Sequence, residues 1–262
     1  MIETHTPLVP AMPRRHGFAQ ALRSEWTKVR TARATAWTPL VMAAIVPVIA
    51  VFVGVTTSIQ PDDTILGGSL TGAPPAQMAA AIFGVLVITS EYSTGTIRST
   101  LAARPQRTTV LAAKAVIVAG STFVASFVAS VIGYQIGDLL LSGEGYAQGD
   151  AMPALVGVAA CFAATGVLGV AIGTILRRSA GAIVAVIGIV MLPSLFGPLF
   201  GDWQRWVAGA SPAAALQKFT QTSDATPEVV GSLGPWPSLA LLGASTVAVL
   251  AASIWLFKCR DA

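Results

Sequence analysis

Long apolar stretches alternate with short polar segments along most of the chain. The apolar stretches lie at about 37–58, 73–90, 110–137, 152–176, 179–200 and 238–257. Most of them approach or exceed the roughly 20 residues that an α-helix needs to cross a bilayer. The pattern predicts an all-α, polytopic membrane protein whose six transmembrane helices form one domain over residues 37–262.

The segment before the first apolar stretch divides into two parts. Residues 1–16 are rich in proline and polar groups, and we expect them to form a disordered tail. Residues 17–36 carry apolar side chains at helical spacing. This stripe consists of Phe18, Leu22, Trp26 and Val29. An apolar stripe with basic flanks predicts an amphipathic helix lying in the membrane interface. The alternative is a cytoplasmic helix that packs on another subunit.

Composition supports lipid as the main solvent. The chain is 54% hydrophobic and only 11% charged, whereas a soluble domain is about a quarter charged. The net charge of +4 does not indicate a nucleic-acid partner, because the basic residues lie in short segments between apolar stretches. The two cysteines, Cys161 and Cys259, suggest neither a disulfide framework nor a metal site.

The charges are distributed asymmetrically across the predicted membrane. All of the 16 lysines and arginines except Arg205 and Lys218 fall on one side, and most carboxylates fall on the other. The positive-inside rule assigns the basic side to the cytoplasm. We therefore expect a protein of the cell membrane with both termini in the cytoplasm, which requires an even number of spans.

Candidate catalytic residues are scarce within the apolar stretches. Both histidines precede the first span, and Lys114 and Asp138 lie near the ends of the third. Ion-coupled carriers usually keep carboxylates or histidines at membrane depth. No lysine follows a glycine, so the Gly-Lys-Ser/Thr core of a Walker A motif is absent from the sequence. We expect a protein that is not an enzyme and binds no cofactor or metal, so that any ATPase driving it is another chain.

The polar segment between the second and third spans is the most informative. It reads EYSTGTIRSTLAARPQR over residues 91–107. Ile97 and Leu101 are four residues apart and share a helical face, and Pro105 ends a short helix near Arg104. An amphipathic helix in this position can dock into a groove on a partner. From the residues alone, a solvated loop whose arginines only set the topology is an equal alternative.

This segment resembles the cytoplasmic loop of type-2 ABC exporter permeases. The similarity lies in Glu-Tyr-x-x-Gly-Thr-Ile-Arg from Glu91 to Arg98, followed by Pro-x-Arg and by a lysine that starts the next span. The leader from Leu22 to Arg30 resembles the opening of actinobacterial members. Six spans with both ends inside match the family over nearly the whole chain.

The resemblance implies the permease subunit of an exporter. Two permease chains, identical or homologous, would form the translocation pathway as a dimer in the lipid bilayer, and a separate ABC ATPase subunit would bind ATP and Mg²⁺. The segment at 91–107 would be the coupling helix seated on that ATPase. Its expected residues are Glu91, Tyr92, Gly95, Thr96, Ile97, Arg98, Leu101 and Arg104. The interfacial helix, also near the ATPase, would use Phe18, Leu22, Glu25, Trp26, Lys28 and Val29.

The resemblance also assigns roles outside the loop helix. Glu91 matches a recurrent acidic residue at the base of the second span, and we expect it to hold the loop through Arg98 or a backbone amide. Residues 201–237 would form external re-entrant helices before the last span.

Two pairs of glycines have GxxxG spacing, which permits close helix approach. They are Gly133/Gly137 and Gly169/Gly173. With 25 glycines in the chain such pairs arise by chance, and packing within the chain is favoured over dimerisation.

Two other functions remain open. An ion-coupled secondary transporter would move its substrate without any ATPase partner. A non-transporting scaffold or immunity component would form a complex through which nothing moves.

Overall fold

The computed structural model describes residues 17–96, 107–203 and 209–259. Its long helices are α2 (Arg33–Thr56), α4 (Ala73–Ser93), α6 (Arg107–Leu141), α7 (Ala151–Leu176), α8 (Ser179–Phe196) and α12 (Pro235–Cys259). The shorter elements are α1 (Phe18–Thr31), α3 (Ile65–Ser69), the 3₁₀ helix η1 (Gly197–Trp203), α10 (Pro212–Thr220) and α11 (Pro227–Val230). Six helices are long and apolar enough to cross a membrane. The prediction of an all-α protein with six membrane spans is therefore confirmed.

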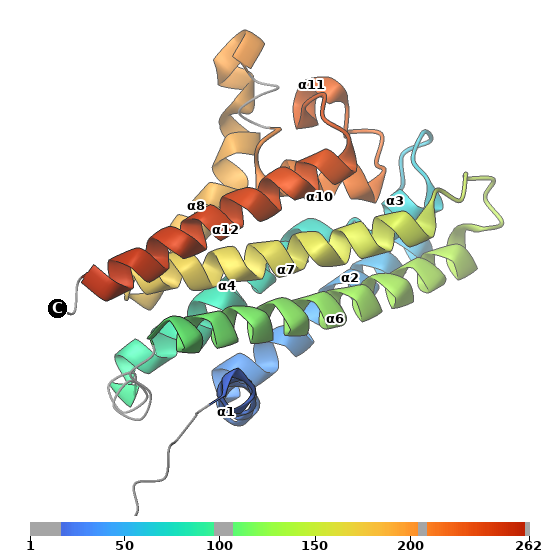
Figure 1. Ribbon diagram of the computed structural model, residues 1–262. Coiled ribbons are helices and arrows are strands. Elements are labelled where there is room, and N and C mark those ends of the chain that lie inside the picture. The colour runs from blue at the N-terminus through green and yellow to red at the C-terminus, as the bar shows by residue number, and fades with distance from the viewer. Residues whose placement is uncertain (1–16, 97–106, 204–208, 260–262) are drawn as a thin grey trace, which may run out of the picture.

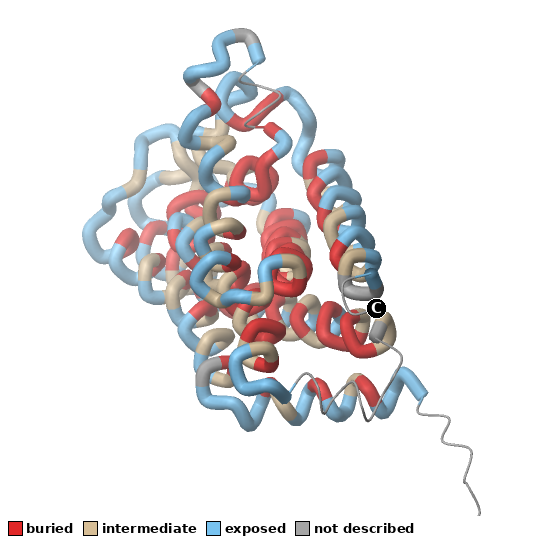
Figure 2. The backbone as a smooth tube through the Cα atoms, turned by 90° about the vertical axis from the view of Figure 1, so that its left-hand side faces the viewer, coloured by how far each residue is buried: buried red, intermediate tan, exposed pale blue. Residues whose placement is uncertain are grey.

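Helix α7 lies at the centre of the bundle. It packs against α4, α6, α8, α10 and α12, and the long helices run alongside it in Figure 1. In its most apolar window 72% of the residues are buried within the chain, against 17% in α8. Figure 2 shows the same contrast, with buried positions concentrated inside the bundle and exposed positions on its outer helices. α7 is thus enclosed by protein, whereas α8 leaves most of its surface for contacts outside the chain.

Glycines allow α4 and α7 to approach closely. A side chain at Gly84 would meet the carbonyl oxygen of Gly166, and one at Gly169 would meet the carbonyl oxygen of Ala81. Such positions accept only a hydrogen atom, so the two backbones lie in direct contact. This contact fixes α4 against the central helix.

Both GxxxG pairs serve packing within the chain, as favoured from the sequence. Gly133 lies against Val46 of α2, and Gly137 lies against Ser69 of α3. The second pair, on α7, lies against α4.

Helix α1 crosses the end of the bundle instead of continuing into the first span. Figure 1 shows α1 nearly end-on while the long helices extend across the view. The helix expected over 17–36 ends at Thr31, because the backbone turns to an extended conformation at Ala32 and α2 begins directly afterwards. The Thr35 hydroxyl donates to the Val29 carbonyl at 3.0 Å, which satisfies a group that the break leaves free.

The connection between the first two spans contains a buried helix that the hydrophobic pattern did not reveal. All five residues of α3 are buried, and the helix packs against α6 and α2. Thr64 caps it, since its hydroxyl accepts a hydrogen bond from the Gly67 amide at 3.0 Å. A helix this short has too few residues to show a period of 3.6.

The described residues of the predicted connection at 201–237 include the helices α10 and α11. The fifth span ends at Phe196 instead of residue 200, and η1 continues the chain. Most of α10 is buried, and it packs against α7 and α12. The last span begins at Pro235 instead of residue 238, because proline suits the first turn of a helix.

Two spans extend past their apolar stretches into the polar segment that joins them. α4 continues beyond the predicted residue 90 to Ser93, and α6 begins at Arg107 instead of residue 110. Glu91 therefore belongs to the last turn of α4, and Lys114 lies two turns inside α6. Both charged side chains are held by regular helices at the end of the bundle that α1 crosses.

Candidate functional site

Helix α1 turns a row of one charged and two apolar side chains towards the bundle. Its buried residues are Ala21, Glu25 and Val29, which are spaced by four and so share one face. Phe18 and Trp26 of the predicted apolar stripe are each 45% exposed. The predicted stripe is therefore not uniformly buried: Val29 packs against the bundle, while the two aromatic side chains are partly exposed.

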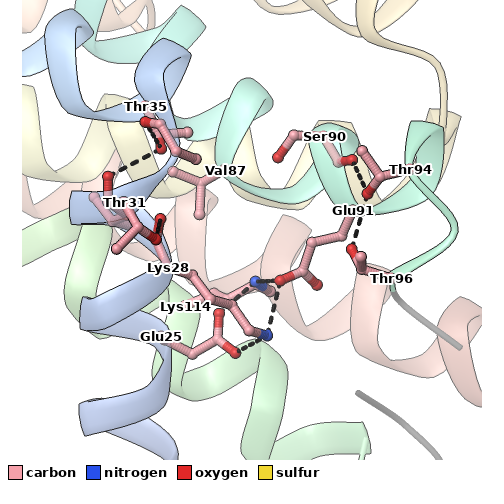
Figure 3. Close-up of a pocket in the computed structure, with 12 residues that line it drawn as sticks. Glu25, Lys28, Thr31, Thr35, Val87, Ser90, Glu91, Thr94, Thr96 and Lys114 are labelled. Atoms are coloured by element: carbon pink, nitrogen blue, oxygen red, sulfur yellow. Dashed lines mark hydrogen bonds and ion pairs between the residues drawn. The ribbon is translucent and has the colours of Figure 1, made fainter. Parts of the chain in front are cut away.

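Four charged side chains from three helices meet where α1 crosses the bundle, and we call them the charged junction: Glu25, Lys28, Glu91 and Lys114. The Lys114 ammonium of α6 pairs with Glu25 Oε2 and lies 2.7 Å from Glu91 Oε1. The Lys28 ammonium of α1 lies 2.7 Å from Glu25 Oε1 and 2.9 Å from Glu91 Oε1. Figure 3 shows these side chains converging. Two cations and two carboxylates balance, and each carboxylate pairs with both lysines.

The junction is unevenly buried. The Lys114 side chain is 1% exposed and that of Glu25 is 3% exposed, whereas Lys28 is 39% exposed. Charges removed from water are stable only when they are paired, and removal of one partner from a buried pair costs about 3–5 kcal/mol. Lys114 and the two carboxylates therefore depend on one another, while Lys28 closes the junction from its outer side.

The environment of Lys28 keeps it protonated. Partial burial by itself lowers the pKa of Lys28, but hydrogen bonds to Glu25 and Glu91 and the charges of these carboxylates outweigh it. The net effect raises the pKa of Lys28 above its ordinary value. Lys28 therefore carries its positive charge at neutral pH.

The last turn of α4 has further partners on the loop between α7 and α8. The Arg177 guanidinium lies 5.6 Å from the centre of the Tyr92 ring, and the Ser179 hydroxyl donates to Thr89 Oγ1 at 2.9 Å. Arg177 adopts a left-handed backbone conformation with φ of +55°, which ends α7 sharply and turns the chain towards α8. The end of α4 is thus contacted by α1, α6 and the α7–α8 turn.

The predicted coupling residues divide between described and undescribed parts of the chain. Glu91 and Tyr92 lie in the last turn of α4, and Gly95 follows with a φ of +69° that favours glycine. Thr96 lies beside the end of α4, since its hydroxyl is 2.9 Å from that of Thr94. The remaining predicted residues, Ile97, Arg98, Leu101 and Arg104, lie outside the described residues.

Glu91 has partners that the sequence did not predict. Its Oε1 atom accepts hydrogen bonds from Lys28 and Lys114, and its Oε2 atom has no hydrogen-bond partner among the described residues. Arg98, the expected partner, is not among the residues described. Within the described part of the chain, Glu91 therefore ties α4 to α1 and α6.

A cavity of about 290 Å³ lies beside the charged junction, between α1 and the end of α4. Thr31 and Thr35 line it from the α1 side, and Ser90 and Thr94 line it from α4, as Figure 3 shows. The ion pair between Lys28 and Glu91 bridges the two helices beside this space. Such contacts can exchange partners or take up water more readily than a close-packed apolar contact.

The junction ties three helices together through ion pairs. Its carboxylates are paired with lysines, and no group of three or more potential ligands placed to hold a metal occurs among the described residues. The junction makes the position of α4 depend on the positions of α1 and α6.

One feature of the sequence indicates the junction, although the hydrophobic pattern alone did not lead to it. Lys114 is the basic residue inside the third apolar stretch, and a charge in a membrane span requires a partner. Glu91 ends the preceding span, and Glu25 and Lys28 have helical spacing. What could not be read was that α1 folds across the bundle and brings Glu25 to Lys114.

The chain matches the family model described as ABC-2 family transporter protein over residues 12–262. No curated protein matches the sequence. The family model covers almost the whole chain, including all six helices suited to crossing a membrane. The resemblance to type-2 ABC permeases is thereby confirmed, while the resemblance to actinobacterial members stays a prediction. This multi-pass membrane protein belongs to the ABC-2 family of transporter proteins.

Proposed function

We propose that the chain is the permease subunit of an ATP-driven exporter whose energy comes from a separate ATPase subunit. Family membership supports a role in transport, and the absence of a Walker A sequence supports a separate ATPase. The observation that carries the proposal is the charged junction, which joins α1, α4 and α6 directly beside the segment expected to dock on that ATPase.

In the proposed mechanism the ATPase moves the segment at 91–107 when it binds and hydrolyses ATP. The segment is continuous with the last turn of α4, where Glu91 pairs with Lys28 and Lys114. A displacement of α4 therefore either carries α1 and α6 along or breaks ion pairs. Because each arrangement of the spans would favour a different nucleotide state of the ATPase, ATP turnover would shift the permease between inward-open and outward-open states.

The proposed orientation places the charged junction in the cytoplasm. The basic residues that dominate this end support it through the positive-inside rule. Helix α1 would lie in the inner membrane surface, with the exposed Phe18 and Trp26 side chains in the interface. The exposed outer helices, α8 in particular, leave surface for a second permease chain, identical or homologous, around a shared pathway.

The proposal is tested by co-purification with a Walker-motif ATPase encoded beside this chain, followed by ATPase measurement in lipid bilayers. Arg98→Glu reverses a charge in the proposed docking segment and should reduce both assembly and ATPase activity. Arg178→Glu is the matched control, because it reverses an exposed charge at the same end of the bundle in another loop.

Two outcomes would contradict the proposal. Assembly and ATPase activity unaffected by Arg98→Glu would remove the docking role of the segment. Substrate movement by the permease alone, in vesicles without any ATPase, would instead indicate a secondary transporter.

A further inference from the structure

A second hollow lies on the outer surface of the bundle, between α1, α2 and α6. This groove has a volume of about 740 Å³, within the range of small-molecule sites. Its walls are predominantly apolar and include Leu40 of α2 and Val116 and Val124 of α6. These three side chains are 50–60% exposed. The groove is therefore part of the surface that the chain presents to its surroundings.

The groove extends from the level of α1 into the depth of the membrane. Val116 and Val124 mark its extent along α6. Eight residues of α-helix correspond to about 12 Å, and one leaflet of the hydrocarbon core is about 15 Å thick. A groove of this length fits most of one acyl chain lying along α6.

Polar groups occur at two places in this apolar groove. Arg30 of α1 lines it, and its guanidinium lies 6.0 Å from the centre of the Trp26 ring, which also lines it. Arg30 has no ion pair with a carboxylate among the described residues. Ser121 also lines the groove, and its buried Oγ has no hydrogen-bond partner in the described part of the chain.

We propose that this groove binds one anionic phospholipid from the leaflet at the α1 end of the bundle. The headgroup phosphate pairs with Arg30, an acyl chain occupies the apolar groove along α6, and the ester region of the lipid accepts a hydrogen bond from the Ser121 hydroxyl. Trp26 lies at the depth where indole rings collect in membranes and orients the guanidinium.

The charge and position of the groove favour a lipid over other occupants. A free anion would gain nothing from the apolar walls, and an apolar peptide would leave Arg30 without a counter-charge. A phospholipid supplies both a phosphate and an acyl chain, at the depths where the groove offers a guanidinium and apolar side chains. The bound lipid would fill the angle between α1 and the bundle and so hold α1 in place.

The site is tested on the permease alone, so its failure is distinguishable from failure of the proposed coupling to an ATPase. The protein is reconstituted in bilayers of equal phosphatidylglycerol and phosphatidylcholine, and retained lipids are counted by native mass spectrometry. We expect one phosphatidylglycerol retained per chain in preference to phosphatidylcholine. Arg30→Gln should lower this preference about fivefold, since one basic residue near the surface has an effect of this size.

Gly120→Leu tests the groove independently of charge. Gly120 lines the groove, and a side chain there meets open space, so leucine fills the groove without displacing a helix. Gly181→Leu is the matched control, because Gly181 is also an exposed helical glycine facing open space but lies on α8. Both substitutions favour helix, so folding is preserved.

The expected result is loss of the retained phosphatidylglycerol in Gly120→Leu and its retention in Gly181→Leu. Equal retention of the two lipids by the wild-type protein would overturn the proposal. So would retention that neither Arg30→Gln nor Gly120→Leu changes.

Discussion

Glu91 connects three helices through a single carboxylate oxygen. Its Oε1 atom accepts hydrogen bonds from Lys28 of α1 and Lys114 of α6, while Glu25 completes the pairing of both lysines. Buried ion pairs add little to stability when compared with apolar replacements, but they are costly to break. The junction therefore favours one arrangement of α1, α4 and α6. Loss of a single charge from it should lower the stability of the protein strongly.

Lys114→Met should destabilise the protein strongly. The substitution keeps the length of the side chain but leaves Glu25 and Glu91 buried with one cation fewer, at a cost of about 3–5 kcal/mol. The measurement is the midpoint of thermal unfolding in detergent or lipid. Lys218→Met is the control, because Lys218 is only partly buried and bonds to the neutral Ser238 hydroxyl.

The pairing itself is tested by the double variant Glu25→Gln/Lys114→Met. Removing both members of a pair should cost less than the sum of the single substitutions, by about 0.5–3 kcal/mol for residues in contact. Strict additivity, or a Lys114→Met effect no larger than that of Lys218→Met, would show that the ion pairs do not form.

At the scale of elements, two kinds of contact hold α4. Along its length it packs backbone to backbone against α7 at glycines. Its last turn is held through Glu91 and Tyr92 by charged side chains of α1, α6 and the α7–α8 turn. Close-packed contacts resist deformation, whereas ion pairs beside a cavity can rearrange. Helix α4 is thus held rigidly along its length by close packing, while the ion pairs at its last turn can change.

Gly84→Ala should separate α4 from α7. The added methyl group would meet the carbonyl oxygen of Gly166, and overpacking of this kind costs about 1–3 kcal/mol. Gly120→Ala is the control, because its methyl group meets open space and should stabilise the helix by up to about 1 kcal/mol. Equal melting temperatures for the two variants would contradict the close approach of α4 and α7.

The contribution of Lys28 to the attachment of α1 should be lost at alkaline pH. The pKa of Lys28 is raised in the folded protein, so its contribution to stability is complete below the ordinary lysine pKa of about 10.4. That contribution is lost as the pH rises through the higher pKa of the folded state. The measurement is the difference in melting temperature between wild type and Lys28→Met as a function of pH. The difference should be constant from neutral pH to about pH 10 and shrink above it; a difference that vanishes near neutral pH would contradict the ion pairs.

For the whole molecule, most of the architecture could be predicted from sequence, because membrane spans are defined by length and hydrophobicity alone. The six spans and the polar segment at 91–107 followed from that pattern. Helix α3 and the buried packing of α10 did not, because short helices carry little periodicity. The charged junction was missed for a different reason: it depends on α1 folding back across the bundle, a contact between residues far apart in the chain.

If the charged junction transmits motion from the ATPase to the spans, ATP should change a distance across the opposite end of the bundle. Cysteines replace Leu139 at the end of α6 and Val229 of α11, both exposed, after Cys259→Ser removes the exposed native thiol. The cysteines carry spin labels, and one labelled permease chain is assembled with the ATPase. The distance between the labels is then measured by electron–electron double resonance with and without ATP.

In the wild-type complex we expect ATP to change this distance, and in Glu91→Gln we expect the complex to assemble and bind ATP with the distance unchanged. An ATP-dependent change in Glu91→Gln equal to that of the wild type would contradict the claim that the junction transmits motion.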